Sequence, residues 1–378
     1  WPPMTNFTFL IFIAFVPLLI IELYFSKKDI GLKEYLAYIY LAFFIFNLSV
    51  TFWIKHAHLG GAIFAILCNS FFMTVVFYLY AKIKHFIGNR QSFFIFAILW
   101  IGFEYLHLNW DLSWPWLTLG NIFSAHPNWV QWYSYTGVLG GTFWILIINF
   151  LFLKLYQFKN SSLSKNWYVV TILVFIAVPI GVSYLIYSNN LKLVAHDTVN
   201  VIVVQPNIDP YKDKFDLSQK HQTKTVLELI DSKINNKLDF LILPETFLVS
   251  PIWVHQLDKN LDIKVFNQLI NRYKNLNIVV GATLLDFSKK TATSKPLLNH
   301  ENQFYKVHNS VLHLNSLGID KYYKSKLVPG AEQMPFQNFL YPILGDKILQ
   351  IGNSTSLGNF SKQDSVSVFS SSKEDYVA

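Results

Sequence analysis

The chain contains 378 residues, of which 52% are hydrophobic, and its mean hydropathy is +0.32. This composition excludes a wholly soluble protein, and the length predicts two domains. A formal net charge of +8 would indicate a nucleic-acid partner in a soluble protein, but much of the basic charge lies in short loops between apolar segments. Membrane topology explains that charge better, so we expect no nucleic-acid partner.

Six apolar segments in the first half are each long enough to cross the hydrocarbon core of a membrane, which takes roughly 20 helical residues. They are residues 5–24, 34–54, 61–81, 92–109, 137–156 and 167–187. Helices buried in a large soluble core are the alternative, but such helices rarely run this long without charges. We therefore predict a multi-pass transmembrane domain over residues 1–190 and a second domain over residues 191–378.

The loops between these segments differ in charge. Alternate loops carry nine lysines and arginines, whereas the remaining loops carry only Lys55. The nine are Lys27, Lys28, Lys33, Lys82, Lys84, Arg90, Lys154, Lys159 and Lys165. Because basic loops remain on the cytoplasmic side of a membrane, this bias predicts that residues 191–378 lie on the opposite, extracytoplasmic side.

The long loop from His107 to Gly137 contains no lysine or arginine and is rich in tryptophan, which prefers the membrane–water interface. An aromatic belt without chemistry is therefore the first interpretation for most of these tryptophans. Glu104 lies inside a predicted span, where a carboxylate is costly and indicates either a function or a partner. His56 and His58 lack a further ligand pattern, so we expect no metal site there.

The residues after about 197 alternate between strand patterns and helix patterns. Strands are predicted at 199–205, 239–243 and 277–282, helices at 216–236 and 261–275, and a β-hairpin at 303–324 with its turn at 315–318. The serine-rich stretch 352–373 is predicted to be a loop or an edge strand. The β-α-β-α-β order predicts an α/β layer fold.

Two segments of this second half carry a chemical pattern. A short apolar strand ends at Pro244 and delivers Glu245 just beyond its end, and Lys324 and Glu332 follow the hairpin. Each residue alone is weak evidence, because such residues are more often solvated. Together they form a set in which one glutamate is a general base, the lysine stabilises an oxyanion, and the second glutamate orients the lysine. We therefore expect the side-chain ends of Glu245 and Lys324 to share one cavity that faces the membrane half.

Several motifs resemble known sequences: VVQPNI at 203–208, LPET at 243–246, HNS at 308–310, YYKSKLVP at 322–329, FEYL at 103–106 and WPWL at 114–117. The second half resembles the nitrilase, or carbon–nitrogen hydrolase, superfamily. The whole chain resembles its membrane-embedded members, the apolipoprotein N-acyltransferases. This resemblance implies an α-β-β-α sandwich for residues 191–378, and it implies no cofactor.

The resemblance also implies roles for individual residues. The catalytic residues would be Glu245 as general base, Lys324 as the oxyanion-stabilising lysine and Glu332 as its supporting glutamate. The substrate-binding residues would be Trp116, Phe215 and Asn309. The resemblance implies a nucleophilic cysteine at the end of the strand that follows the loop at 352–373, past Ala378. Cys68, the one cysteine present, lies in a predicted span and cannot substitute for it. We therefore expect a chain truncated at both ends that is inactive as it stands.

The implied reaction is acyl transfer in two steps. A cysteine thiolate attacks the sn-1 ester of a phospholipid, and the resulting thioester passes its acyl group to the α-amine of a diacylglyceryl-cysteine lipoprotein. The implied location is the bacterial inner membrane, with the catalytic domain on the periplasmic side, and we expect a monomer. The alternatives are a membrane-bound amidase or nitrilase, a non-catalytic lipid-facing pseudoenzyme, and a transporter with an outer binding domain.

Overall fold

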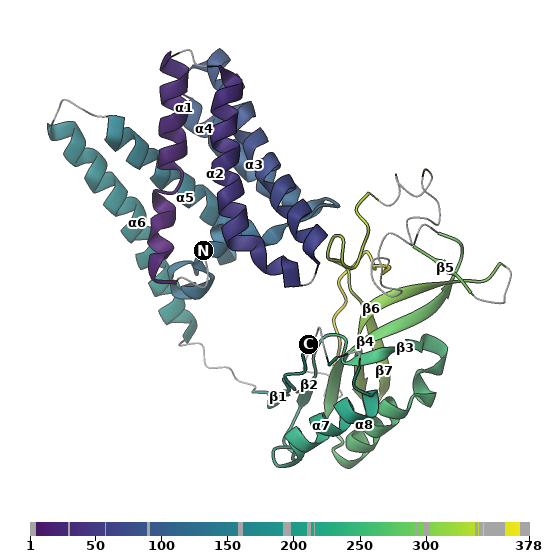
Figure 1. Ribbon diagram of the computed structural model, residues 1–378. Coiled ribbons are helices and arrows are strands. Elements are labelled where there is room, and N and C mark those ends of the chain that lie inside the picture. Colours follow the sequence, from purple (N-terminus) through teal and green to yellow (C-terminus); the bar gives the residue numbers. More distant parts are fainter. Residues whose placement is uncertain are drawn as a thin grey trace. The chain divides into compact units, whose positions relative to one another are not determined.

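The chain forms two compact units, Trp1–Val194 and Ala195–Ala378 (Figure 1). The computed structural model describes residues 5–28, 31–56, 58–88, 91–157, 162–191, 198–209, 213–214, 216–291, 293–297, 302–336, 339, 343 and 360–370.

The first unit is helical, and its described residues include six helices long and apolar enough to cross a membrane. Its elements are η1 (Thr5–Phe12), α1 (Val16–Lys28), α2 (Leu32–Thr51), η2 (Phe52–His56), α3 (Leu59–Ile87), α4 (Ser92–Asn109), η3 (Pro115–Leu117), η4 (Leu119–Ala125), η5 (Pro127–Trp129), α5 (Tyr133–Gln157) and α6 (Ser162–Leu191). The prediction of six membrane-spanning segments is therefore confirmed, and the chain is a multi-pass membrane protein.

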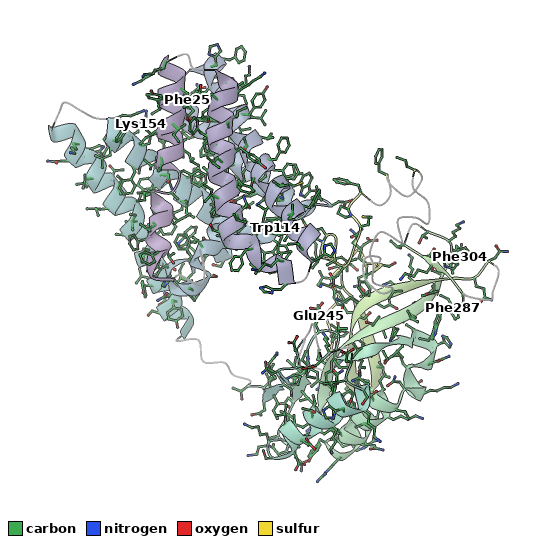
Figure 2. All side chains as sticks on the ribbon, in the orientation of Figure 1. Phe25, Trp114, Lys154, Glu245, Phe287 and Phe304 are labelled. Carbon is green, nitrogen blue, oxygen red and sulfur yellow. The ribbon has the colours of Figure 1, made fainter. Side chains whose placement is uncertain are left out.

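Aromatic side chains fill the interior of this unit. Phe15, Phe77, Phe96 and Trp100 are buried and contact one another edge to face or stacked. The outward residues of the helices are also apolar, as expected of surfaces that meet lipid. Figure 2 shows Lys154 near one end of the unit and Trp114 near the other. The extracytoplasmic side that we assign to the second unit stays a prediction.

Several charged and polar groups inside the helical unit are paired across helices. Lys84 of α3 donates a hydrogen bond of 2.5 Å to Glu22 of α1, and both side chains are buried. Asn69 of α3 donates to the side-chain oxygen of Asn47 in α2 at 2.6 Å. These contacts tie the helices together at points where unpaired polar groups would be costly in lipid. His58 accepts a hydrogen bond from the backbone of Gly61 and so caps α3.

The second unit contains a seven-stranded mixed sheet among its described residues. The strands are β1 (Val201–Val203), β2 (Phe240–Ile242), β3 (Leu248–Trp253), β4 (Asn277–Ser288), β5 (Lys295–Pro296), β6 (Phe304–Asn315) and β7 (Gly318–Tyr323). Strands β1, β2 and β4 run parallel side by side, β3 is parallel to β4, and β6 pairs antiparallel with β4, β5 and β7. The connections between the parallel strands contain α7 (Gln219–Asp231), η6 (Val254–Lys259) and α8 (Leu261–Arg272).

Both helices cover the same face of this sheet (Figure 1). Because side chains alternate along a strand, Leu241, Ile278 and Leu312 point into the core with Val226 of α7 and Phe266 of α8. Ser218 caps the first turn of α7, and Asn260 caps that of α8. The residues in between on the strands face the opposite side of the sheet, where the candidate site lies.

The predicted α/β order is confirmed, with differences at several elements. β3 was not predicted, because Pro251 lies within it and proline is disfavoured inside strands; the strand is tolerated because it pairs only with β4, across a register shift. The strand predicted at 277–282 continues to Ser288. The second sheet and helix layer that a sandwich would require are not among the described residues, so the four-layer arrangement stays a prediction. Of the predicted loop at 352–373, the structure describes 360–370, where isolated bridges replace a regular strand.

Candidate active site

Glu245 lies at the carboxyl end of β2, where the chain leaves the sheet and crosses β4. Thr246 adopts a left-handed backbone conformation with φ of 52°. The backbone crosses so closely that a Cβ atom on Gly281 would lie 2.4 Å from the nitrogen of Thr246 and 2.7 Å from the Cα of Glu245. The N–H of Gly281 donates to the carbonyl oxygen of Pro244 at 3.3 Å. The absence of a side chain on Gly281 therefore allows β4 to support the turn that carries Glu245.

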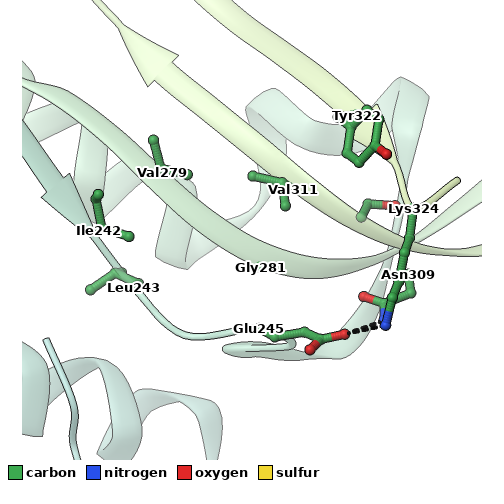
Figure 3. A pocket seen from close by; sticks show the side chains of 10 residues that line it. Ile242, Leu243, Glu245, Val279, Gly281, Asn309, Val311, Tyr322 and Lys324 are labelled. Atoms are coloured by element: carbon green, nitrogen blue, oxygen red, sulfur yellow. Dashed lines mark hydrogen bonds and ion pairs between the residues drawn. The ribbon is translucent and has the colours of Figure 1, made fainter. Parts of the chain in front are cut away.

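Lys324 comes from the end of β7 and reaches both glutamates. Its backbone N–H donates to the carbonyl oxygen of Asn309 on β6 at 2.9 Å. Its Nζ lies 3.0 Å from Oε1 of Glu245 and 3.0 Å from Oε1 of Glu332. Figure 3 shows Glu245, Asn309 and Lys324 converging at one end of a pocket. The prediction that the side-chain ends of Glu245 and Lys324 lie together is confirmed; that the cavity faces the membrane half stays a prediction.

The side-chain amide of Asn309 links the same two carboxylates. Nδ2 lies 2.6 Å from Oε1 of Glu245 and 2.7 Å from Oε1 of Glu332. An amide nitrogen has two hydrogens, so it can donate one to each carboxylate. Asn309 and Lys324 therefore form two parallel bridges between the glutamates, one neutral and one cationic.

The two glutamates differ in their surroundings. Glu332 has a side chain that is 13% exposed, and its Oε2 accepts a hydrogen bond of 2.7 Å from the backbone of Val328. Glu245 has a side chain that is 63% exposed, and within the described part of the chain its Oε2 has no hydrogen-bond partner. Glu332 is therefore held on both oxygens, whereas Glu245 keeps one oxygen free for chemistry.

The contacts also set the protonation states. Burial raises the pKa of Glu245, but the hydrogen bonds from Lys324 and Asn309 outweigh burial and hold it below the usual value. Burial lowers the pKa of Lys324, but its bonds to both glutamates hold it above the usual value. Lys214 donates from Nζ to the backbone oxygen of Glu245 at 3.2 Å, and burial lowers its pKa. The site therefore contains an ionised base beside a permanently charged lysine at neutral pH.

The pocket has a volume of about 380 Å³. Its floor consists of side chains that point away from the helix-covered face: Ile242 of β2, Val279 of β4, Val311 of β6 and Tyr322 of β7. The charged groups lie at one end and the apolar floor extends away from them (Figure 3). Such a pocket suits a ligand with one reactive polar group on an apolar body.

Two further residues were predicted to bind substrate. Trp116 belongs to η3 in the first unit, and Phe215 lies outside the described residues. Lys214 and Gly281 were missed by the sequence reasoning. Lys214 is one of many lysines, and Gly281 shows its importance only through the backbone that crosses it. In the part of the chain that the structure describes, no cluster of three or more His, Cys, Asp or Glu residues could hold a metal ion.

The family model described as "Apolipoprotein N-acyltransferase N-terminal domain" matches residues 1–151. A protein named apolipoprotein N-acyltransferase from Chlorobaculum tepidum is 25% identical over 304 residues, which is 79% of this chain and 56% of that protein. The one from Borreliella burgdorferi is 26% identical over 348 residues, which is 89% of this chain and 62% of that protein. The one from Rickettsia prowazekii is 26% identical over 261 residues, with 67% of this chain and 47% of that protein covered.

The chain thus spans roughly half to three fifths of the length of these relatives. The matches cover both units and agree with the multi-pass helices followed by the α/β sheet. Over most of its length the chain is therefore similar to proteins named apolipoprotein N-acyltransferase, and these matches support that assignment.

Proposed function

We propose that this protein is an acyltransferase that moves an acyl chain from a phospholipid to the N-terminal amine of a diacylglyceryl-cysteine lipoprotein. The observation that carries the proposal is the cluster of Glu245, Lys324, Glu332 and Asn309 at one end of an apolar pocket. The names of the relatives and the six membrane-length helices support lipid substrates.

In the first step, the free Oε2 of Glu245 takes the proton of a cysteine thiol, and the resulting thiolate attacks the ester carbonyl of the phospholipid. A carboxylate with a lowered pKa is ionised at neutral pH and can therefore accept this proton, and the neighbouring cation favours the thiolate. The nucleophile on this proposal is a cysteine other than Cys68, which belongs to the membrane helix α3. The ester bond breaks, and the lysophospholipid leaves with a proton.

Lys324 stabilises the oxyanion that forms on the carbonyl oxygen in both steps. Its ammonium is held by Glu332, which is itself held by Asn309, before the reaction begins, so little reorganisation is needed in the transition state. In the second step Glu245 takes a proton from the α-amine of the lipoprotein as this amine attacks the thioester. The sulfur leaves as the thiolate, and the acyl group ends in an amide.

Both substrates are lipids, which accounts for a catalytic unit joined to six membrane helices. We place the protein in the bacterial inner membrane with the second unit on the periplasmic side, because the basic loops of the first unit belong on the cytoplasmic side. No metal or cofactor takes part in this chemistry, and the acting form is a monomer.

Mass spectrometry tests the proposal directly. The protein encoded by the complete reading frame is purified in detergent and incubated with phospholipid and a diacylglyceryl lipopeptide. The lipopeptide should gain the mass of one acyl chain, and Glu245→Gln and Lys324→Met should each abolish the gain, whereas Lys326→Met, an exposed neighbour, should not. Release of ammonia from small amides without acyl transfer would favour the amidase alternative and refute the proposal.

A further inference from the structure

Glu104 is a buried carboxylate that the proposed chemistry does not use. It lies near the carboxyl end of α4, and only 3% of the residue is exposed. A carboxylate inside a membrane span is costly, so its surroundings must compensate for the lost water. The described residues provide no cation within ion-pair distance of it. They provide three neutral hydrogen-bond donors.

These donors come from three separate elements. Oε1 accepts from Nε1 of Trp100 on α4 and from the backbone N–H of Leu119, the first residue of η4, at 2.9 Å each. Oε2 accepts from Oγ1 of Thr142 on α5 at 2.5 Å. Glu104 therefore connects α4, η4 and α5 through one carboxylate.

Gly120, the next residue of η4, is also hydrogen-bonded to α5. The N–H of Gly120 donates to Oγ1 of Thr142 at 3.3 Å, and its carbonyl accepts from the hydroxyl of Tyr133 at 3.0 Å. A Cβ atom on Gly120 would lie 2.2 Å from the carbonyl oxygen of Val138, so only glycine fits. The start of η4 is therefore built to sit between α4 and α5.

Three residues before Leu119, the same loop presents Trp116 at the surface of the helical unit. Trp116 is 40% exposed and contacts Trp114 at 4.8 Å and Trp53, which is 47% exposed, at 6.4 Å between ring centroids. The labelled Trp114 marks this end of the unit in Figure 2. Flat aromatic faces that remain exposed beside membrane helices suit a lipid acyl chain.

We propose that Glu104 is a positioning residue that fastens η4 between α4 and α5, and thereby holds Trp116 where the acyl chain of the lipid substrate binds. The lipid part rests on the proposed function, whereas the fastening part does not. The role depends on hydrogen-bond acceptance and not on charge. Glutamine can therefore replace Glu104, because its oxygen can accept from Trp100 and Leu119 while its amide group donates to Thr142.

Hydrogen exchange measured by mass spectrometry tests the fastening without any substrate. In Glu104→Ala, the amides of Leu119 and Gly120 should exchange at least roughly tenfold faster than in the wild type. The N–H of Leu119 loses its acceptor in this variant, and η4 is held less firmly. Glu104→Gln should stay within about threefold of the wild type. If Glu104→Ala does not fold, exchange is measured in Thr142→Val in its place. Glu22→Gln, which alters a buried carboxylate paired with Lys84 elsewhere in the unit, is the matched control and should leave η4 unchanged.

Kinetics with the phospholipid donor test the second part. Glu104→Ala should raise the KM for phospholipid by roughly tenfold with a smaller change in kcat, and Glu104→Gln should restore it. Wild-type exchange in Glu104→Ala, or exchange in Glu104→Gln as fast as in Glu104→Ala, would refute the fastening. A loosened η4 with an unchanged KM would refute the role in lipid binding. If the wild-type protein encoded by the complete reading frame transfers no acyl group, the proposed function fails, but the exchange results still decide whether Glu104 fastens η4.

Discussion

Gly281→Ala perturbs the position of Glu245 without touching any charged group of the site. The new methyl group would lie 2.4 Å from the nitrogen of Thr246, 2.6 Å from the oxygen of Pro244 and 2.7 Å from the Cα of Glu245. All three are backbone atoms, so no side chain can rotate away. Restoring ordinary contact requires a shift of about 1 Å, and a misplacement of that size typically costs about 100-fold in rate, or about 2.7 kcal/mol of transition-state stabilisation.

The assay is acyl transfer to a lipopeptide, followed by mass spectrometry, together with the melting temperature. We expect kcat/KM of Gly281→Ala to fall by about 100-fold, with overpacking destabilising the unit by about 1–3 kcal/mol. Gly102→Ala on α4 is the matched control, because a Cβ atom there meets nothing within 4 Å and the rate should stay unchanged. If Gly281→Ala retains the wild-type rate, the close crossing of β4 does not determine where Glu245 lies, and the reasoning is wrong.

Other contacts lead to further predictions. Asn309→Leu removes a hydrogen bond that lowers the pKa of Glu245, so the acidic limb of the pH–rate profile should move to higher pH. If the limb does not move, Asn309 does not set the pKa of Glu245. Lys84→Met leaves Glu22 buried and unpaired, and should destabilise the helical unit by roughly 3–5 kcal/mol, whereas adding Glu22→Leu should recover most of the loss in thermal unfolding. Thr246→Gly should relieve a left-handed φ and raise the melting temperature slightly, since the relief of about 1–2 kcal/mol exceeds the entropy that glycine costs.

Chain order and residue chemistry were enough to predict the main elements of the site. Glu245 could be found because a buried apolar strand ends just before it, and the carboxyl ends of parallel strands meet at one edge of a sheet. Lys324 and Glu332 could be found because they follow a hairpin whose strands β6 and β7 lie beside β4. The register between neighbouring strands could not be predicted. That register places Asn309 opposite Thr283, where its carbonyl oxygen accepts a hydrogen bond from the backbone of Lys324.

The role of Glu104 shows the same limit in the membrane unit. Its position in an apolar segment predicted that it has a partner, but the sequence gives no sign that this partner is the backbone of Leu119. Backbone N–H groups exist at almost every residue, so a contact to one depends on the path of the loop. Lys214 escaped notice for the related reason that its partner is the carbonyl oxygen of Glu245. Contacts between side chains could be anticipated from residue types, whereas contacts to the backbone could not.

The two glutamates show how one residue type takes two roles within a few ångströms. In both glutamates Oε1 accepts hydrogen bonds from Lys324 and Asn309, so the difference between them lies in the contacts of Oε2 and in exposure to solvent. The lowered pKa of Glu245 means that its contribution to stability is present above the unfolded value near 4.5 and is lost as the pH falls through the folded value. The raised pKa of Lys324 means that its contribution is present below 10.5 and is lost as the pH rises through the folded value. Between these limits Glu245 and Lys324 keep their charges, and Oε2 of Glu245 is the oxygen that we propose takes and returns the proton during turnover.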